Sequence, residues 1–262
     1  MKKEFLKLFN IRESKADIEF VKLILNAFSN IPYENITKIV KFSQYQENKN
    51  EDYLRYGDEI ISDYTNLGAG GTCFSLTNYL YDLLSSMHFQ CYRVMADRSY
   101  GNNTHCAIIV ELNDGQYLLD PGYLLSEPVK LNKGIDSLIK TPISDVIIKP
   151  LENGAKFALN TIDKSGIKER YILKNNPESD DTFKKHWLDS FNFPMMNHIL
   201  ITKMFPEGQL YLRNNYFQKN TASKKEKKKM NEISTELIFS AFGINDELSK
   251  LAIDIIKNNI KK

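Results

Sequence analysis

The 262-residue sequence contains little cysteine. Its three cysteines, Cys73, Cys91 and Cys106, are scattered, with no CxxC pair and no His/Cys cluster at zinc-ligand spacing. We therefore expect no disulfide framework and no metal site. Reduced thiols are typical of a cytoplasmic protein, which is the location we expect.

The sequence also lacks an excess of charge of one sign and a long apolar run. Lys plus Arg number 35 against 33 Asp plus Glu, a formal net charge of +2, which is too balanced to indicate a nucleic-acid or anionic-membrane surface. No run approaches the ~18 apolar residues needed to span a bilayer. Residues 11–15 interrupt the N-terminal stretch before a signal-peptide core could form. We expect neither a nucleic-acid nor a membrane partner.

What is present is an ordinary globular composition, with 42% hydrophobic and 26% charged residues. This lies far from the composition of disordered chains. At roughly 100–200 residues per domain, the length allows one large domain or two to three small ones. Such a chain can bury a sizeable core.

The first third of the sequence has the apolar spacing of helices. The apolar positions between Ile18 and Phe28 form one stripe of an amphipathic helix, and residues 73–84 have helical period again. This spacing places Cys73 in the first turn of a helix. We therefore predict a helical region up to about residue 88.

From Gln90 the period becomes that of short strands separated by turns. Asn113-Asp114-Gly115 is the clearest hairpin signal, because Asp-Gly readily adopts the backbone angles of a tight turn. Together the runs predict a small antiparallel sheet or barrel. The predicted strands are residues 90–95, 105–112, 116–119, 146–148, 155–159 and 170–173.

The last third is mixed. Residues 197–217 have no single period, whereas residues 236–260 again have helical spacing. Between them lies the basic run 224–229. We interpret this run as a solvated loop rather than a contact for a CoA phosphate or a nucleic acid, because short charge runs are usually surface.

The candidate chemistry centres on Cys73, which follows the small-residue turn 68–72. A cysteine attacks as the thiolate, so a thiol with an ordinary pKa near ~8.5 needs activation. A helix N-terminus and an imidazole can both supply it. His105 and Asp120, 15 residues apart across the predicted hairpin, could face each other and complete a Cys/His/Asp relay.

Each of these residues also has a purely structural interpretation. Cysteines are often buried small hydrophobes, which is what we expect of Cys91 and Cys106. His105 could be a core histidine, and Asp120, before Pro-Gly, an ordinary turn residue. Spacing alone also leaves open a cysteine peptidase or a transglutaminase-like enzyme.

Taken together, the motifs resemble those of the arylamine N-acetyltransferase family. The family's Arg-Gly-Gly-x-Cys-Phe resembles residues 69–74, and its Pro-Phe-Glu-Asn-Leu resembles residues 32–36. Its Thr-His pair is similar to residues 104–105, and its Asp-Val-Gly-Phe to residues 120–123. The matches follow the family's order along the chain.

The resemblance implies an α+β fold in three parts with a cysteine-peptidase-like Cys/His/Asp core. Residues 1–88 would form an N-terminal helical bundle that carries the nucleophile. Residues 89–180 would form a central antiparallel β-barrel that carries the histidine and the aspartate. Residues 181–262 would form an α/β lid.

The resemblance also implies a ping-pong acyl transfer from acetyl-CoA, or another acyl-CoA, to an arylamine, hydrazine or other small amine. Cys73 would be the nucleophile, His105 the base, and Asp120 the residue that orients the base. Phe74 and Tyr123 would contact substrate. No cofactor beyond the CoA cosubstrate and no metal are implied.

Two departures from the family's pattern affect these expectations. Ala69 replaces the family's arginine, so the buried partner of Glu34 is expected to be missing or supplied by Arg93 or Arg98. Pro121, after the aspartate, is more similar to transglutaminase-like enzymes. The alternatives are therefore a transglutaminase-like cysteine hydrolase or amide synthase, or a non-catalytic member that only binds a ligand.

Overall fold

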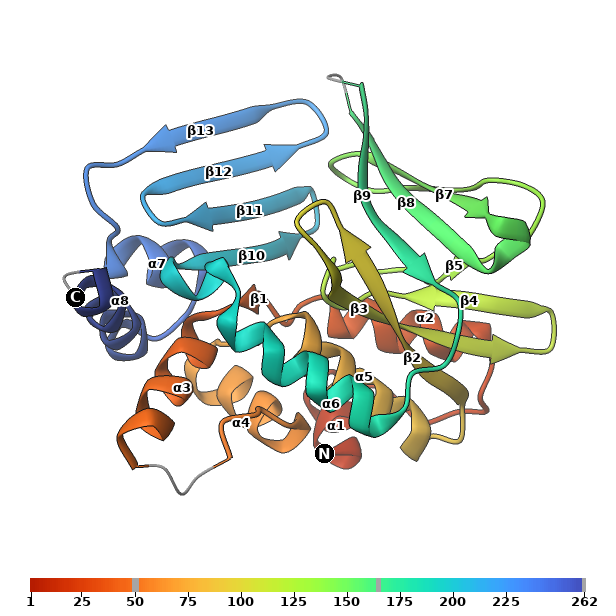
Figure 1. Cartoon of the computed structure of the whole chain (residues 1–262), viewed down its shortest axis with the longest axis horizontal. Helices are drawn as coiled ribbons and strands as arrows, with labels where there is room; N and C mark the ends of the chain where they lie inside the picture. Colours follow the sequence, from red (N-terminus) through yellow and green to blue (C-terminus); the bar gives the residue numbers. More distant parts are fainter. Residues whose placement is uncertain (49–51, 164–165, 261–262) are drawn as a thin grey trace.

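The structure, a computed structural model, describes residues 1–48, 52–163 and 166–260. Helices come first along the chain and lie beneath two antiparallel sheets (Figure 1). In these ranges, no helix is both long and apolar enough to cross a membrane. The N-terminal helices are α1 (Lys2–Leu8), α2 (Ile18–Phe28), α3 (Ile36–Asn48), α4 (Gly57–Leu67) and α5 (Cys73–Ser86).

The predicted helices are confirmed at α2 and α5. The Asp17 side chain caps α2 by accepting the Phe20 N–H. Most apolar positions of α2 are buried, but Leu23 is 55% exposed and lies outside the buried face. α5 begins at Cys73, as the spacing predicts, and residues 73–80 are all buried. α5 is therefore the central helix on which the nucleophile candidate is fixed.

The larger sheet has eight antiparallel strands in the order β5-β4-β3-β2-β9-β8-β7-β6 and curls into a barrel (Figure 1). Each of the six predicted strands forms, and the predicted hairpin joins β3 to β4, with Leu112 opposite Gly115. The strands are β2 (Gln90–Arg98), β3 (Gly101–Leu112), β4 (Gly115–Leu119), β5 (Val129–Lys130), β6 (Ser137–Lys140), β7 (Asp145–Leu151), β8 (Lys156–Asp163) and β9 (Gly166–Lys174).

β3 separates two hydrophobic cores because successive side chains on a strand point to opposite faces. Cys106 and Ile108 pack into the core shared with the helices. Ala107 and Ile109 pack into the core inside the barrel. His105, next to Cys106 on this strand, thus lies where the helical part meets the barrel.

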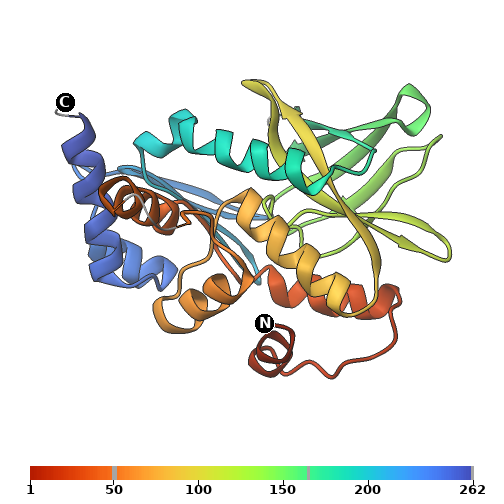
Figure 2. The same cartoon turned by 60° about the horizontal axis from the view of Figure 1, so that its bottom comes forward.

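The second sheet has the order β1-β10-β11-β12-β13 and packs against two helices of the C-terminal part. Its first strand, β1 (Tyr33–Glu34), comes from the N-terminal part and pairs with β10. α6 (Asp180–Asp189) crosses between the barrel and this sheet (Figure 2). The other elements are β10 (Leu200–Phe205), β11 (Gly208–Arg213), β12 (Tyr216–Thr221), β13 (Lys225–Lys229), α7 (Thr235–Phe242) and α8 (Asp246–Ile260).

The prediction of a loop at residues 224–229 is wrong for all but its first residue. Residues 225–229 form the strand β13, which pairs with β12 at the edge of the sheet, and all five are exposed. Charged side chains on an edge strand discourage pairing with other chains. The run is therefore solvated, as predicted, although its backbone is extended and paired.

The α+β class is confirmed, with helices first, then an antiparallel barrel, then an α/β lid. The boundaries at residues 88 and 180 remain predictions. Asn35 ties the first part to the last, since its side chain donates to the carbonyls of Met195 (2.7 Å) and His198 (2.8 Å).

Candidate active site

Cys73 is placed by a turn that only a small residue permits. A Cβ on Gly70 would lie 1.9 Å from the Pro32 carbonyl oxygen, so this close approach requires glycine. Thr72 then takes an extended conformation and Cys73 becomes the first residue of α5. The unpaired N–H groups at the start of this helix favour an anion at the thiol.

His105 and Asp120 meet inside the protein. His105 Nε2 lies 2.8 Å from Asp120 Oδ2, and neither side chain is exposed. The strand ladder ends where Leu119 pairs with Ile108, so Asp120 lies just beyond β4 and reaches His105 diagonally. The two residues meet as predicted, but they are not directly opposite each other.

Two further groups hold the Asp120 carboxylate. The Tyr171 hydroxyl donates to Oδ2 over 2.6 Å, and the Tyr123 N–H donates to Oδ1 over 2.8 Å. Burial alone would raise the pKa of Asp120, but His105 and these hydrogen bonds outweigh it and hold that pKa below its ordinary value. The carboxylate thus stays charged. Nothing in the sequence around Tyr171 indicates this contact.

Cys73 and His105 both pack against Gly122. A Cβ on Gly122 would be 2.6 Å from Cys73 Cβ and 3.0 Å from His105 Cε1. The Asp-Pro-Gly turn therefore packs against both residues, and at Gly122 it leaves room for a hydrogen atom only. This packing brings together the three residues that the sequence predicted as a relay.

The surroundings of Cys73 favour the ionised form of its thiol. A hydrogen bond with Cys106 is the main cause that holds the pKa of Cys73 well below its ordinary value. Burial opposes this effect, and His105 and Arg98 reinforce it. Burial raises the pKa of Cys106, which stays a thiol. Burial lowers the pKa of His105, but Asp120 outweighs that effect and raises it overall.

Gly122→Ala should lower the rate of the reaction catalysed at this site about 100-fold, because a misplacement of the reacting groups by ~1 Å costs roughly that factor. The measurement is kcat/KM at neutral pH. Gly134→Ala is the matched control, since a Cβ there would meet nothing within 4 Å. Equal rates for the two variants would contradict the packing described here.

The two predicted substrate contacts lie beside this site. Phe74 is buried against Phe183, with ring centroids 5.5 Å apart. Tyr123 is partly buried, 6.3 Å from the Tyr171 ring. Contact of either ring with substrate remains a prediction. Within the described ranges, no group of three or more His, Cys, Asp or Glu side chains could hold a metal ion.

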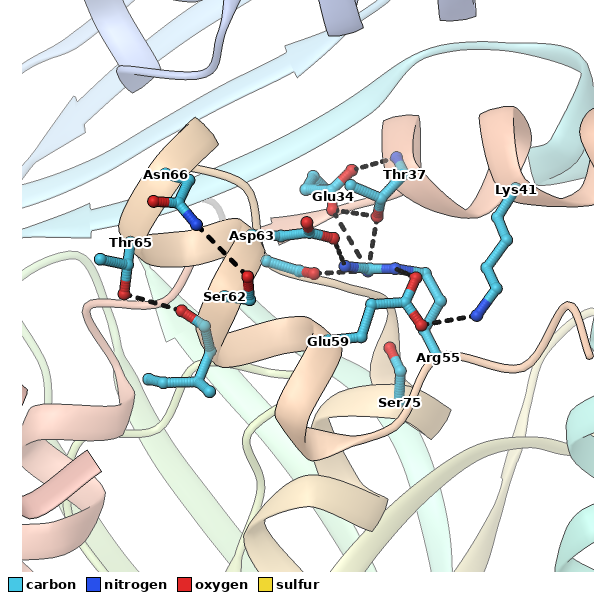
Figure 3. A network of polar contacts seen from close by, with 12 residues as sticks. Glu34, Thr37, Lys41, Arg55, Glu59, Ser62, Asp63, Thr65, Asn66 and Ser75 are labelled. Carbon is cyan, nitrogen blue, oxygen red and sulfur yellow. Dashed lines mark hydrogen bonds and ion pairs between the residues drawn. The ribbon is translucent and has the colours of Figure 1, made fainter. Parts of the chain in front are cut away.

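The expectation that Arg93 or Arg98 replaces the missing arginine is wrong. Arg55 takes that place, with Nη1 3.8 Å from Glu34 Oε1 and 2.6 Å from the Gly70 carbonyl oxygen (Figure 3). Thr37 bridges Arg55 and Glu34 by a hydrogen bond to each. Arg93 instead pairs with Asp180.

Two acidic residues of α4 hold Arg55 in position beside Glu34. It lies just before α4, where Nη2 pairs with Asp63 over 2.5 Å and Nε with Glu59 over 3.3 Å. These partners fix the guanidinium beneath the turn that carries the nucleophile. The chain thus supplies the buried cation beside Glu34 from a segment that lies outside the nucleophile motif.

Arg55→Ala should lower the free energy of unfolding by about 3–5 kcal/mol, because it leaves Glu34 charged and buried without a cation. Urea denaturation measures this change. Lys22→Ala, which removes an exposed pair with Glu19, should leave stability nearly unchanged. A similar, small effect of both substitutions would show that the buried network does not stabilise the turn.

Comparisons with known proteins found a family model and a set of solved structures that match this chain. A family model described as N-acetyltransferase matches residues 18–250. A separate search of curated proteins found no match. Many solved structures have the same fold at low sequence identity.

Three of these structures show the extent of the likeness. The arylamine N-acetyltransferase of Mycobacterium abscessus has a TM-score of 0.80 at 14% identity, covering 98% of this chain and 95% of that one. The Salmonella typhimurium arylamine N-acetyltransferase has a TM-score of 0.74 at 18% identity, covering 96% and 97%. The Bacillus cereus arylamine N-acetyltransferase NAT3, whose triad is Cys-His-Glu, has a TM-score of 0.71 at 20% identity, covering 93% and 98%.

The resemblance seen in the motifs is confirmed by the family match. The acyltransferase interpretation therefore holds over the hydrolase, amide-synthase and non-catalytic alternatives. The chain belongs to the arylamine N-acetyltransferase family and is an acyltransferase.

Proposed function

We propose that Cys73 carries the acyl group between an acyl-CoA, acetyl-CoA in the first instance, and an arylamine, hydrazine or other small amine. The observation that supports this proposal best is the thiol of lowered pKa at the start of α5, beside the buried pair of His105 and Asp120. A nucleophile, a base and a group that orients the base are the parts that covalent acyl transfer requires.

In the first half of the reaction, Cys73 gives its proton to His105 and attacks the carbonyl carbon of the CoA thioester. A tetrahedral intermediate forms, and its oxyanion is stabilised by backbone N–H groups at the start of α5. The bond to the CoA sulfur breaks as His105 returns the proton, so CoA leaves as a thiol. Asp120 stabilises the imidazolium throughout.

In the second half, the amine attacks the thioester on Cys73. His105 takes a proton from the attacking nitrogen and gives it to the departing Cys73 sulfur, which releases the amide and restores the free enzyme. We assign Tyr123 and Phe74 to the substrate pocket, because Tyr123 follows the turn at Gly122 and Phe74 follows the nucleophile.

Incubation of the protein with acetyl-CoA should add one acetyl group, detected by intact-protein mass spectrometry and mapped to Cys73. Because the pKa of Cys73 is lowered, the rate of acylation should be at its plateau at neutral pH. It should fall only as the pH drops through that lowered pKa and the thiolate is protonated.

Addition of an arylamine should then remove the acetyl group and yield the amide. An adduct mapped to Cys91, or the absence of an adduct with every acyl-CoA tried, would overturn the proposal. We also propose a cytoplasmic location, which the three free cysteines support. Fractionation of cells that produce the protein tests it.

A further inference from the structure

Arg98 lies at the end of β2 and contacts the proposed base. Its Nη2 is 2.9 Å from Nδ1 of His105. A guanidinium only donates hydrogen bonds, so Nδ1 accepts this one and carries no proton. Nε2 then carries the proton and donates it to Asp120. Nδ1 is therefore the nitrogen that must take the thiol proton, and Arg98 covers its lone pair.

The guanidinium of Arg98 has an N–H group that makes no hydrogen bond within the described residues. Its Nη1 contacts the hydroxyl of Tyr100, a side chain that is 63% exposed, over 3.2 Å. Its Nε is buried and has no hydrogen-bond partner, and no acidic side chain pairs with Arg98 in the part of the chain that the structure describes. A buried donor left unpaired is unfavourable, and an acceptor on a bound ligand would satisfy it.

The backbone around Arg98 is held in place. The neighbouring Asp97 accepts the Asn103 N–H over 2.8 Å and pairs with Lys174 over 2.7 Å. The pairing of β2 with β3 is irregular between Ala96 and Arg98, as is common where a strand re-aims a side chain toward a site. These contacts fix the backbone at the end of β2. The guanidinium itself contacts only a neutral imidazole and a phenol.

We propose that Arg98 is a specificity-determining residue that binds a carboxylate carried by the substrate. This inference rests on the proposed function of the site. A carboxylate accepts two parallel N–H bonds from an arginine, so it would engage Nε and Nη2 together. Nη2 then leaves Nδ1, and the lone pair of His105 becomes free to accept a proton. The substrate's carboxylate thus docks the substrate and makes His105 a more effective base than it is with an uncharged substrate.

The carboxylate belongs either to the acyl donor, as in the half-thioester of a dicarboxylic acid, or to the amine, as in an aminobenzoate. Matched pairs of substrates separate these sources. The first pair is succinyl-CoA and butyryl-CoA with one neutral amine. The second is 4-aminobenzoate and 4-aminobenzamide with one neutral acyl-CoA.

The experiment measures kcat/KM for both pairs with the wild-type protein, Arg98→Met, Arg98→Lys and the exposed control Arg12→Met. Arg98 also lowers the pKa of Cys73, so its loss affects every substrate. This shared effect cancels in the ratio of kcat/KM for the charged substrate to kcat/KM for the neutral substrate of the same pair. In one of the pairs, Arg98→Met should reduce that ratio about 10- to 100-fold, as expected for a lost charge-assisted contact.

Arg98→Lys should keep part of the preference, and Arg12→Met all of it. A wild-type protein that is active but has no preference in either pair would overturn the inference while the proposed function stands. An unchanged ratio in Arg98→Met would overturn it as well. If the wild-type protein transfers no acyl group from any donor, the proposed function itself fails.

Discussion

Cys73→Ser should reduce kcat/KM for acyl transfer by at least about 10⁴-fold, a loss typical of a removed nucleophile. Serine is close in size to cysteine, so the packing against Gly122 is kept. A hydroxyl, however, is not ionised by the environment that lowers the pKa of the thiol. The acetyl adduct should disappear together with turnover.

Cys91→Ser is the matched control for this experiment. Cys91 is half-buried on β2, 3.6 Å from the hydroxyl of Ser85, and burial raises its pKa. It should therefore behave as a structural thiol, and its substitution should leave the rate close to that of the wild type. If Cys73→Ser kept more than a hundredth of the activity, another residue would have to carry the acyl group.

Asp120→Asn should lower kcat about 10⁴-fold with the fold intact, since this is the loss seen when an amide replaces the aspartate of such a relay. The amide would offer an N–H to Nε2 of His105 and so move the ring proton to Nδ1. The imidazole would then present a proton to Cys73 instead of accepting one. Steady-state kinetics beside near-ultraviolet circular dichroism separates lost catalysis from lost structure.

Two further variants provide activities with which the loss in Asp120→Asn can be compared. Tyr171→Phe removes only the hydroxyl that donates to Asp120 Oδ2, and it should cost about tenfold. Asp114→Asn changes an exposed aspartate of the hairpin turn and should have no effect on rate. If Asp120→Asn lost no more activity than Tyr171→Phe, the carboxylate would not set the tautomer of His105.

Local patterns explain why part of this site could be predicted. The Asp-Gly turn fixes the β3–β4 hairpin, and the glycines before Cys73 fix the start of α5. Both features depend on residues that are neighbours in the sequence, so periodicity and turn chemistry suffice to find them. The meeting of His105 with Asp120 follows directly from that hairpin.

The residues that sequence reasoning missed act across long distances in the chain. Tyr171 reaches Asp120 from β9, and Arg55 reaches Glu34 from the segment before α4. The sequence suggests Arg98 only as a possible partner of Glu34, because its contact with His105 depends on the irregular pairing of β2 with β3. No spacing rule predicts such contacts, because tertiary packing alone brings these side chains together.

The pairing of β1 with β10 has a consequence for how the protein folds. Asn35 and Leu200, which exchange hydrogen bonds beside this pair, are 165 residues apart along the chain. A growing polypeptide must therefore leave the edge of Tyr33–Glu34 that faces β10 unpaired until the whole barrel has been synthesised. Contacts at such separation slow folding, because the entropy of closing the loop is lost before the contact forms. The N-terminal helices should thus collapse early, and completion of the second sheet should be the late step that orders residues 33–35.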